Sequence, residues 1–418
     1  MKKKNFLILI IWILSIIASI LWTFENPEKI EKIKSYFKKK KIIESKVINE
    51  TITEVTANSF HVNFNKVLEI KDKTAFVMHK NGKNFNTEDL EIYTQSGTLI
   101  KNLKSYRLKL PDYFTLQRNG GIKTIISYEG KRIALISGSE KDCFFASLIL
   151  IENNQELFRS KCLPEVAKNN DFNGLGSSNV HLQNSILFSL GTPEKHASKN
   201  SLLAQKDNSN FGKILEIKKS DLEKKIAGSN EPLKINIFSK GHRVPQGLTI
   251  LNENVFNVEH GPKGGDELNK VERGQNYGWP VVSYGTNYLK EGGGDGVSFK
   301  INHERNGYVE PLFAFLPSVG ISNLNNCPSV LKNYYKKNCL IGLSLYGNNL
   351  RKGHSIIIFL LNEKLNKVDS IEKISLGNLV LRHFVTDENN ILYEDENGNI
   401  YVSADKNGIY MISFNKFR

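Results

Sequence analysis

Residues 252–261, NENVFNVEHG, join a polar turn to an apolar strand, and this unit decides the fold because it recurs along the chain. Each copy has a turn of Gly, Asn, Asp or Lys followed by β-branched and aromatic residues. The six copies are KDKTAFVMH (71–79), EGKRIALISG (129–138), LQNSILFSLG (182–191), NENVFNVEHG (252–261), KNCLIGLSLYG (337–347) and ENGNIYVSAD (396–405).

The spacing of these copies predicts an all-β, six-bladed β-propeller over residues 52–418. Equivalent positions are separated by 59, 53, 69, 85 and 60 residues, which leaves room for four strands and their loops in each blade. A pair of β-sandwiches would also give alternating strands, but it would not repeat one strand unit six times. The two widest spacings predict long loops after Gly191 and after Gly261.

The N-terminal segment is a candidate membrane span. Phe6 to Phe24 is an almost uninterrupted apolar run of 19 residues that follows three lysines, and this length matches a bilayer core. We predict a signal anchor, a transmembrane helix, over residues 1–24; a cleaved signal peptide is the alternative. Residues 25–51 form a basic juxtamembrane linker, which either lies on anionic lipid or is a solvated spacer.

Charge argues against nucleic acid as a partner. Residues 1–41 hold ten lysines and three glutamates, so 10 − 3 = +7 of the formal net charge of +14 lies there. The remaining residues show no basic run interleaved with aromatic residues.

Two sequence patterns point to different cellular compartments for the propeller. Seven of the lysines follow the apolar run and three precede it, which favours a cytoplasmic domain. The four cysteines fall as two local pairs, Cys143 with Cys162 and Cys327 with Cys339, and two disulfides require an oxidising compartment. We expect the propeller on the periplasmic or extracellular side; four unpaired thiols in the cytosol are the alternative.

Residues 239–288 hold a candidate cation site. Gly261, Pro262, Gly264 and Gly265 form a tight turn whose carbonyl oxygens can point outward, and Asp266 and Glu267 follow directly. Carbonyl and carboxylate oxygens suit calcium. The alternative is a turn with a solvated acidic tip.

Three linked motifs in this region resemble the soluble quinoprotein glucose/sorbosone dehydrogenase family. They are GHRVPQGL (241–248), EHGPKGGDELN (259–269) and GQNYGWPVVSYGTNY (274–288). Weaker matches are GGIKTII (120–126), NSILFSLG (184–191), NFGKILEI (210–217), LPSVGISNL (316–324) and NGIYMISF (407–414), so the likeness covers roughly residues 115–416.

The resemblance implies a six-bladed propeller that binds pyrroloquinoline quinone (PQQ) and calcium and oxidises a small sugar in the periplasm. Arg243, Gln246 and Arg382 match residues expected to contact the cofactor. The backbone of Gly261 and Pro262 matches the calcium-binding pair.

The chain also departs from the family pattern. Val244 stands in place of an asparagine, and Val380 and Tyr346 stand where an arginine and a lysine are expected. The general-base histidine has no clean counterpart; the candidates are Asp171, nearest the expected place, and His181, which alternates with apolar residues as a strand side chain does.

Two functions therefore stay open. The first is an anchored, PQQ-dependent sugar dehydrogenase with calcium. The second is a propeller that has lost redox chemistry and binds a glycan or a protein partner. A calcium-dependent hydrolase or lactonase would need acidic and Asn ligands from several blades, and the sequence does not supply such a set.

Overall fold

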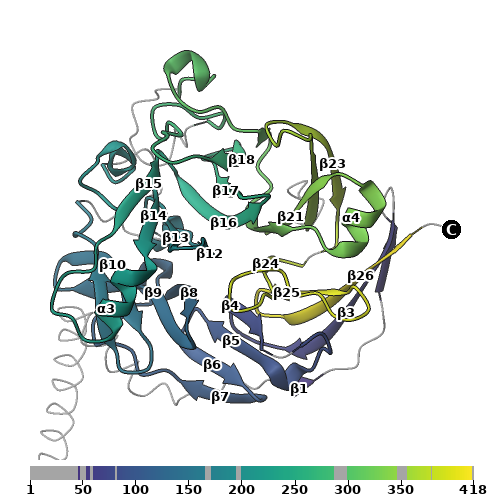
Figure 1. Cartoon of the computed structure of the whole chain (residues 1–418), viewed down its shortest axis with the longest axis horizontal. Coiled ribbons are helices and arrows are strands. Elements are labelled where there is room, and N and C mark those ends of the chain that lie inside the picture. Colours follow the sequence, from purple (N-terminus) through teal and green to yellow (C-terminus); the bar gives the residue numbers. More distant parts are fainter. Residues whose placement is uncertain are drawn as a thin grey trace, which may run out of the picture. The chain divides into compact units, whose positions relative to one another are not determined.

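The computed structural model describes residues 46–47, 53–56, 60–80, 82–164, 171–193, 199–286, 299–345, 355–377 and 379–416. These residues form six antiparallel sheets arranged around one axis (Figure 1). The prediction of an all-β, six-bladed β-propeller is confirmed. The predicted span of residues 1–24 lies outside the described residues, and none of the described helices is long and apolar enough to cross a membrane.

The blades follow one another along the chain, each with its innermost strand first. Blade 1 consists of β4 (Thr74–His79), β5 (Leu90–Thr94), β6 (Thr98–Lys101) and β7 (Lys104–Arg107). Blade 2 consists of β8 (Ile122–Tyr128), β9 (Lys131–Glu140), β10 (Cys143–Leu150) and β11 (Gln155–Arg159). Blade 3 consists of β12 (Asn179–His181), β13 (Ser185–Leu190), β14 (Lys213–Lys218) and β15 (Asn236–Lys240). Blades 4 and 5 consist of β16 (Val244–Leu251), β17 (Asn254–His260), β18 (Asp266–Val271) and β19 (Phe313–Phe315); and β20 (Ile321–Asn326), β21 (Asn338–Ser344), β22 (Ile356–Leu361) and β23 (Val368–Ile374).

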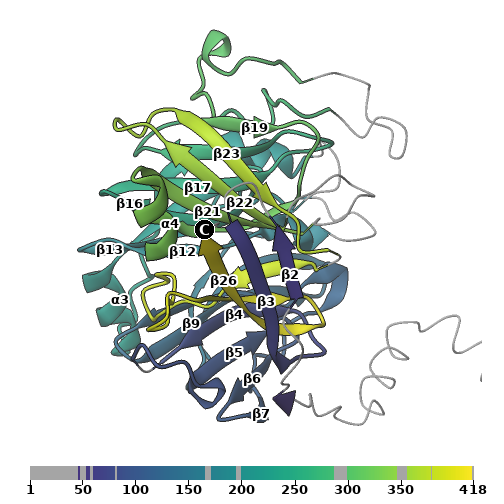
Figure 2. The same cartoon turned by 90° about the vertical axis from the view of Figure 1, so that its right-hand side faces the viewer.

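Blade 6 is built from both ends of the chain. Its strands are β24 (Leu381–Phe384), β25 (Ile400–Ala404), β26 (Gly408–Lys416) and β3 (Phe60–Glu69), with the short β1 (Lys46–Val47) and β2 (Thr53–Thr56) paired to β3. β26 is antiparallel to β3 from Gly408 opposite Glu69 to Lys416 opposite Phe60. Figure 2 shows β3 beside β26. This pairing closes the ring and leaves no open edge at the seam.

Short helices occur only between strands in the described parts of the chain. They are the α-helices α3 (Lys219–Ile226) and α4 (Ser329–Tyr335) and the 3₁₀ segments η1 (Thr87–Asp89), η2 (Gln117–Asn119), η3 (Asp171–Leu175), η4 (Ser201–Gln205) and η5 (Glu304–Asn306).

The core lies between neighbouring blades. Strands such as β22, IIIFLL, are buried along their whole length because both faces of the blade pack against another blade. This is why the recurring strand reads as a continuous apolar run rather than as an alternation.

The predicted repeat is in register in five blades and shifted in one. Ile133, Ile186, Val255, Leu340 and Ile400 lie on second strands, β9, β13, β17, β21 and β25. Thr74, however, begins β4, an innermost strand, and the second strand of blade 1 is β5. Both strand types are buried on both faces, so their apolar runs look alike in sequence.

One of the two predicted long loops is misplaced. The connection from β13 to β14 is long and contains η4, as expected. After Gly261, by contrast, the chain turns within a few residues and enters β18 at Asp266. The long insertion of blade 4 lies one strand later, between Val271 and Phe313.

Both predicted cysteine pairs are disulfides. Cys143 at the start of β10 is bonded to Cys162 beyond β11, and Cys327 before α4 is bonded to Cys339 in β21. The alternative of four unpaired thiols is wrong.

Candidate active site

Five of the six blades contribute to a pocket where their innermost strands begin, which we call the axial pocket. Its empty volume is about 510 Å³, counting space open to solvent. Its polar lining includes Lys73 before β4, Lys123 in β8, Asn173 in η3, Gln246 in β16, and Arg382 and His383 in β24. None of the described residues that line it is an aspartate or a glutamate.

β-Bulges direct these side chains toward the pocket. The register slips between Ile122 and Thr124 in β8, between Pro245 and Gly247 in β16, and between Leu381 and Phe384 in β24. The residues at the slips are Lys123, Gln246, and Arg382 with His383. A bulge re-aims a side chain out of the regular pleat. Bulge positions in three blades thus supply four of the polar residues that line the pocket.

Arg382 lies in the axial pocket as predicted for a cofactor-contacting residue, but its guanidinium is already engaged. Nε donates to Oδ1 of Asp405 at 3.0 Å, and Nη2 donates to Oδ2 of the same carboxylate. The charge of Arg382 is therefore largely compensated inside the protein. Burial and the neighbouring Arg382 lower the pKa of His383 to about 3, so this imidazole is neutral at pH 7.

Lys73 and Lys123 were missed in the sequence. Lys123 Nζ donates a 2.7 Å hydrogen bond to the carbonyl oxygen of Asn119. Burial, with Arg382 and Lys73 as neighbouring cations, lowers the pKa of Lys123 to about 7. The signal that could have found Lys123 is a lone lysine inside an otherwise apolar innermost strand, IKTIISY.

Arg243 lies beside the axial pocket, over the turn that follows β17. Its Nη1 donates to the carbonyl oxygens of His260 at 3.2 Å and of Gly261 at 2.6 Å. The guanidinium also sits 5.2 Å from the ring centre of Trp279, within the range of a cation–π contact. Burial, with smaller effects from the positive charges of Arg243 and Arg382, lowers the pKa of His260.

The turn at 261–265 requires glycine. A Cβ on Gly261 would lie 2.2 Å from the carbonyl oxygen of Gly265, and Gly265 itself has φ of +70°. The tight turn brings the Gly261 carbonyl to Arg243. Pro262 follows in the same turn.

Asp266 stabilises this turn from inside. Oδ1 accepts a hydrogen bond from Gly261 N at 3.1 Å, and Oδ2 accepts from Val319 N at 3.0 Å and from Gly320 N at 2.6 Å. The carboxylate is 1% exposed. These bonds give Asp266 a structural role; its predicted role as a metal ligand stays a prediction.

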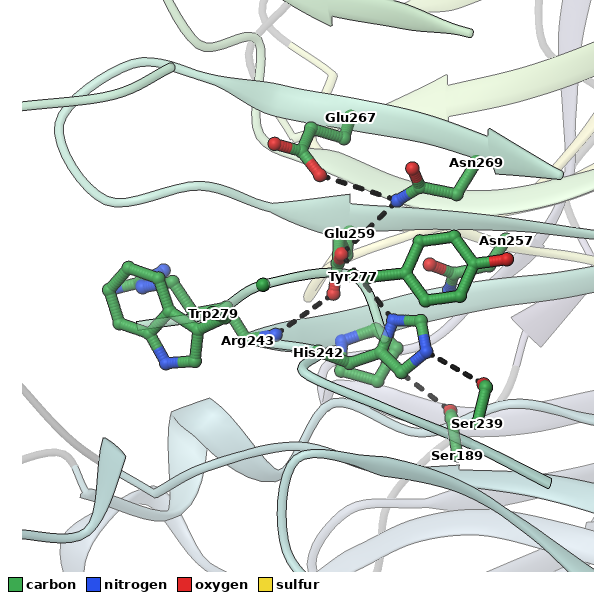
Figure 3. Close-up of polar contacts among 12 residues, drawn as sticks. Ser189, Ser239, His242, Arg243, Asn257, Glu259, Glu267, Asn269, Tyr277 and Trp279 are labelled. Atoms are coloured by element: carbon green, nitrogen blue, oxygen red, sulfur yellow. Dashed lines mark hydrogen bonds and ion pairs between the residues drawn. The ribbon is translucent and has the colours of Figure 1, made fainter. Parts of the chain in front are cut away.

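A buried network, which we call the blade-4 polar cluster, lies behind Arg243 (Figure 3). Asn269 Nδ2 donates to Oε1 of Glu259 at 3.2 Å and to Oε2 of Glu267 at 3.3 Å. The other oxygen of Glu259 accepts the backbone N–H of Arg243 at 2.9 Å. Burial and the nearby Glu259 carboxylate raise the pKa of Glu267 well above its usual range. Glu259 thus holds the Arg243 backbone in place.

Two buried histidines flank this cluster. His242 accepts or donates a 2.8 Å bond with Ser239 Oγ, and its Nδ1 lies 3.5 Å from Glu259 Oε1. His303 Nε2 lies 3.6 Å from Glu267 Oε1. No group of three His, Cys, Asp or Glu side chains among the described residues is arranged to hold a metal ion.

The two candidate bases lie at different places. Asp171 begins η3, the segment whose Asn173 lines the axial pocket, although the Asp171 side chain is outside the described residues. His181 lies at the far end of β12, next to the turn into β13. Burial and Lys219 lower the pKa of His181 to about 4. The structure brings only the Asp171 segment to the pocket.

The structure describes two of the three residues that depart from the family pattern. Val244 is buried at the start of β16, and Val380 accepts a backbone hydrogen bond from Asp405 N at 2.9 Å. Tyr346 lies outside the described residues.

Comparison with curated proteins gives short matches. An uncharacterised protein of Synechocystis is 34% identical over 125 residues, 29% of each chain. An aldose sugar dehydrogenase of Escherichia coli is 34% identical over 22% of this chain and 24% of its own. The quinoprotein glucose dehydrogenase B of Acinetobacter calcoaceticus is 30% identical over 45% of this chain and 36% of its own. The matches thus span about a quarter to a third of the curated relatives.

Solved structures share the fold over most of the chain. A glucose dehydrogenase superposes with a TM-score of 0.62 at 18% identity, covering 88% of this chain and all of that one. The PQQ-bound aldose sugar dehydrogenase of Streptomyces coelicolor gives 0.54 at 14% identity, again over 88% and 100%.

The family itself is shown by a longer match. The sequence model described as glucose/sorbosone dehydrogenase matches residues 137–407, more than half of the chain, and includes all three linked motifs of blade 4. The chain belongs to the glucose/sorbosone dehydrogenase family.

Proposed function

We propose that this protein is a quinone-dependent oxidoreductase that oxidises a small sugar, with PQQ bound in the axial pocket. The observation that carries the proposal is the lining of that pocket, where Lys73, Lys123, Gln246 and Arg382 converge without a carboxylate among the described lining residues. This lining suits a planar ligand with several carboxylates. Relatives named as a quinoprotein glucose dehydrogenase and as a PQQ-bound aldose sugar dehydrogenase support the cofactor.

The chemistry that PQQ supplies when bound is the acceptance of two electrons, as a hydride from the carbon that carries the sugar hydroxyl. The protein must bind and orient the ligand and supply a base for the hydroxyl proton. Gln246 and Arg382 offer hydrogen-bond donors from two bulges. Arg243 offers a positive charge, fixed by Glu259 and Gly261, that can stabilise developing negative charge.

The base remains part of the proposal. Asp171 is the better of the two candidates, because η3 reaches the axial pocket whereas His181 is at the opposite end of its strand. A carboxylate acts as a base near neutral pH when burial raises its pKa.

Calcium does not fit the arrangement as it stands. The carbonyl oxygen of Gly261, one of the two predicted ligands, already accepts a 2.6 Å bond from the Arg243 guanidinium. A calcium ion on the same oxygen would be repelled by the guanidinium. Calcium at Gly261 and Pro262 therefore requires Arg243 to swing away, and we derive no catalytic step from the ion.

The two disulfides support an oxidising compartment. We propose that residues 1–24 anchor the propeller on the periplasmic or extracellular side of a membrane.

The proposal is tested by titrating the purified full chain with PQQ, with and without calcium, while the absorption spectrum of the quinone is followed. We expect saturable binding at micromolar concentrations and reduction of an electron-accepting dye with at least one aldose. If PQQ does not bind, the proposed dehydrogenase function is wrong.

One observation favours a second function, a propeller that binds a glycan or a protein partner without redox chemistry. His383, the one histidine lining the axial pocket among the described residues, has its pKa lowered to about 3 and is a poor base. Quinone binding without dye reduction across a panel of aldoses would support this second function.

A further inference from the structure

We propose that Lys73 and Lys123 are the carboxylate-binding residues of the axial pocket, and that Lys123 takes up a proton when a ligand with several carboxylates binds. This inference rests on the proposed function, since it names how the same pocket would hold its cofactor. Neither lysine belongs to the three linked motifs of residues 241–288, although Lys123 lies in the weaker match GGIKTII (120–126).

The first argument is position. Lys123 is the extra residue of the β8 bulge, which corresponds in blade 2 to Gln246 in blade 4 and to the Arg382–His383 pair in blade 6. Lys73 directly precedes β4, the innermost strand of blade 1. Bulge positions are thus repeated around the axis, and blade 2 places a cation at this position. In blade 1 the bulge residue is Ala75, and the cation Lys73 stands two residues before it in the same lining.

The second argument is charge. Asp405 compensates Arg382 through two hydrogen bonds. By contrast, the charged groups that act on Lys123 are two cations, Arg382 and Lys73. Since His383 is neutral and Arg382 is paired with Asp405, Lys73 and the protonated form of Lys123 give the pocket its net positive charge. A ligand with several carboxylates is the partner that this charge fits.

The third argument is the unused hydrogen-bonding capacity of Lys123. An ammonium group has three donors. Within the described parts of the chain, Lys123 Nζ makes one hydrogen bond, to Asn119 O. Two donors therefore remain for ligand oxygens.

Proton uptake follows from the surroundings of Lys123. Burial and the two neighbouring cations lower the pKa of Lys123 to about 7, so at about pH 8 the neutral amine is favoured. A carboxylate placed beside the amine favours its charged form and raises this pKa again. Binding at about pH 8 therefore draws close to one proton from solution, and affinity falls as the pH rises above 7.

These lysines also account for the departures from the family pattern. The cations expected at Val380 and Tyr346 are absent from the sequence. Lys73 and Lys123 supply positive charge to the same pocket from blades 1 and 2 instead.

The test is calorimetric titration of the full chain with PQQ and, separately, with benzene-1,3,5-tricarboxylate, a planar tricarboxylate without a quinone. Each titration is run at about pH 8 in phosphate and in Tris, whose ionisation enthalpies differ, so that the difference reports protons taken up. We expect close to one proton per ligand for the wild type. For Lys123→Met we expect none, with affinity reduced roughly ten- to hundred-fold.

Lys73→Met, at a partly exposed position, tests the second lysine and should weaken binding without abolishing proton uptake. Lys131→Met is the matched control, because Lys131 is exposed in β9 and its loss changes the net charge equally. It should leave affinity and proton uptake unchanged.

The outcomes separate the inference from the proposed function. Quinone binding that Lys123→Met leaves unchanged overturns the role of Lys123 but not the dehydrogenase. Binding of the tricarboxylate with proton uptake, but not of the quinone, supports the lysines and overturns the dehydrogenase. Binding of neither probe at about 1 mM overturns both.

Discussion

The guanidinium of Arg243 and the carbonyl oxygen of Gly261 are joined by a 2.6 Å hydrogen bond, so a side chain predicted to bind cofactor occupies a backbone atom predicted to bind calcium. The bond depends on the glycine turn, which a Cβ on Gly261 would disrupt. Two predicted roles thus compete for one position.

Removing the guanidinium should strengthen calcium binding. In Arg243→Met the positive charge is lost and the Gly261 carbonyl is freed, so we expect calcium affinity in the absence of quinone to rise roughly ten-fold or more. Calorimetric titration with calcium measures the change. Arg305→Met, at an exposed position in η5, is the control. Equal calcium affinity in wild type and Arg243→Met would show that the two cations do not compete.

Glu267 should make stability fall as the pH rises. Its pKa in the folded protein is raised by burial and by Glu259, so its protonated form is favoured and stability is lost as the pH rises above the unfolded value of about 4.3. We expect Glu267→Gln to melt at a higher temperature than the wild type at pH 8, by roughly 2 °C per kcal/mol, and to differ little at pH 4. Parallel melting curves across the pH range would contradict this.

Lys123 should make stability rise as the pH rises. Its folded pKa of about 7 lies below the unfolded value of about 10.4, so the wild type gains stability as the pH rises between these values. Lys123→Met, without ligand, should therefore be more stable than the wild type at pH 7, and the advantage should shrink toward pH 10. Thermal unfolding across this range measures the difference. A constant difference would mean that Lys123 is charged in the folded protein throughout.

Both disulfides should contribute to stability. They bridge sequence separations of 19 and 12 residues, for which chain entropy predicts a contribution of about 3 kcal/mol each. Replacing Cys143 and Cys162 together with alanine should lower the free energy of unfolding in urea by about this amount. Reductant should destabilise the wild type more than this variant, and an equal effect on both would contradict the estimate.

The sequence predicted the ring because its signal is repeated. Ile133, Ile186, Val255, Leu340 and Ile400 occupy the second strand of five blades, since packing between blades demands the same apolar run each time. Thr74 was assigned to the wrong strand because the innermost strand of blade 1 is buried in the same way.

The site was predicted only where motifs describe it. Gln246 and Arg382 line the axial pocket, and Arg243 and Gly261 lie beside it, joined by a hydrogen bond that the motifs did not indicate. Lys123 was missed because a β-bulge sets the direction of its side chain. In a strand that is buried on both faces, a one-residue slip in pairing does not change the apolar pattern of the sequence.

The axial pocket is complete only after the two ends of the propeller have come together. Lys73 stands near the beginning of the propeller and Arg382 near its end, and the Thr74 and Ser403 hydroxyls, 2.8 Å apart, join blade 1 to blade 6. A nascent chain therefore lacks a complete pocket until β24 has been synthesised and lies beside β4 of blade 1. Any ligand bound between Lys73 and Arg382 then links blade 1 to blade 6. Saturating the protein with this ligand should therefore stabilise the contact between the first and last blades and slow proteolysis there.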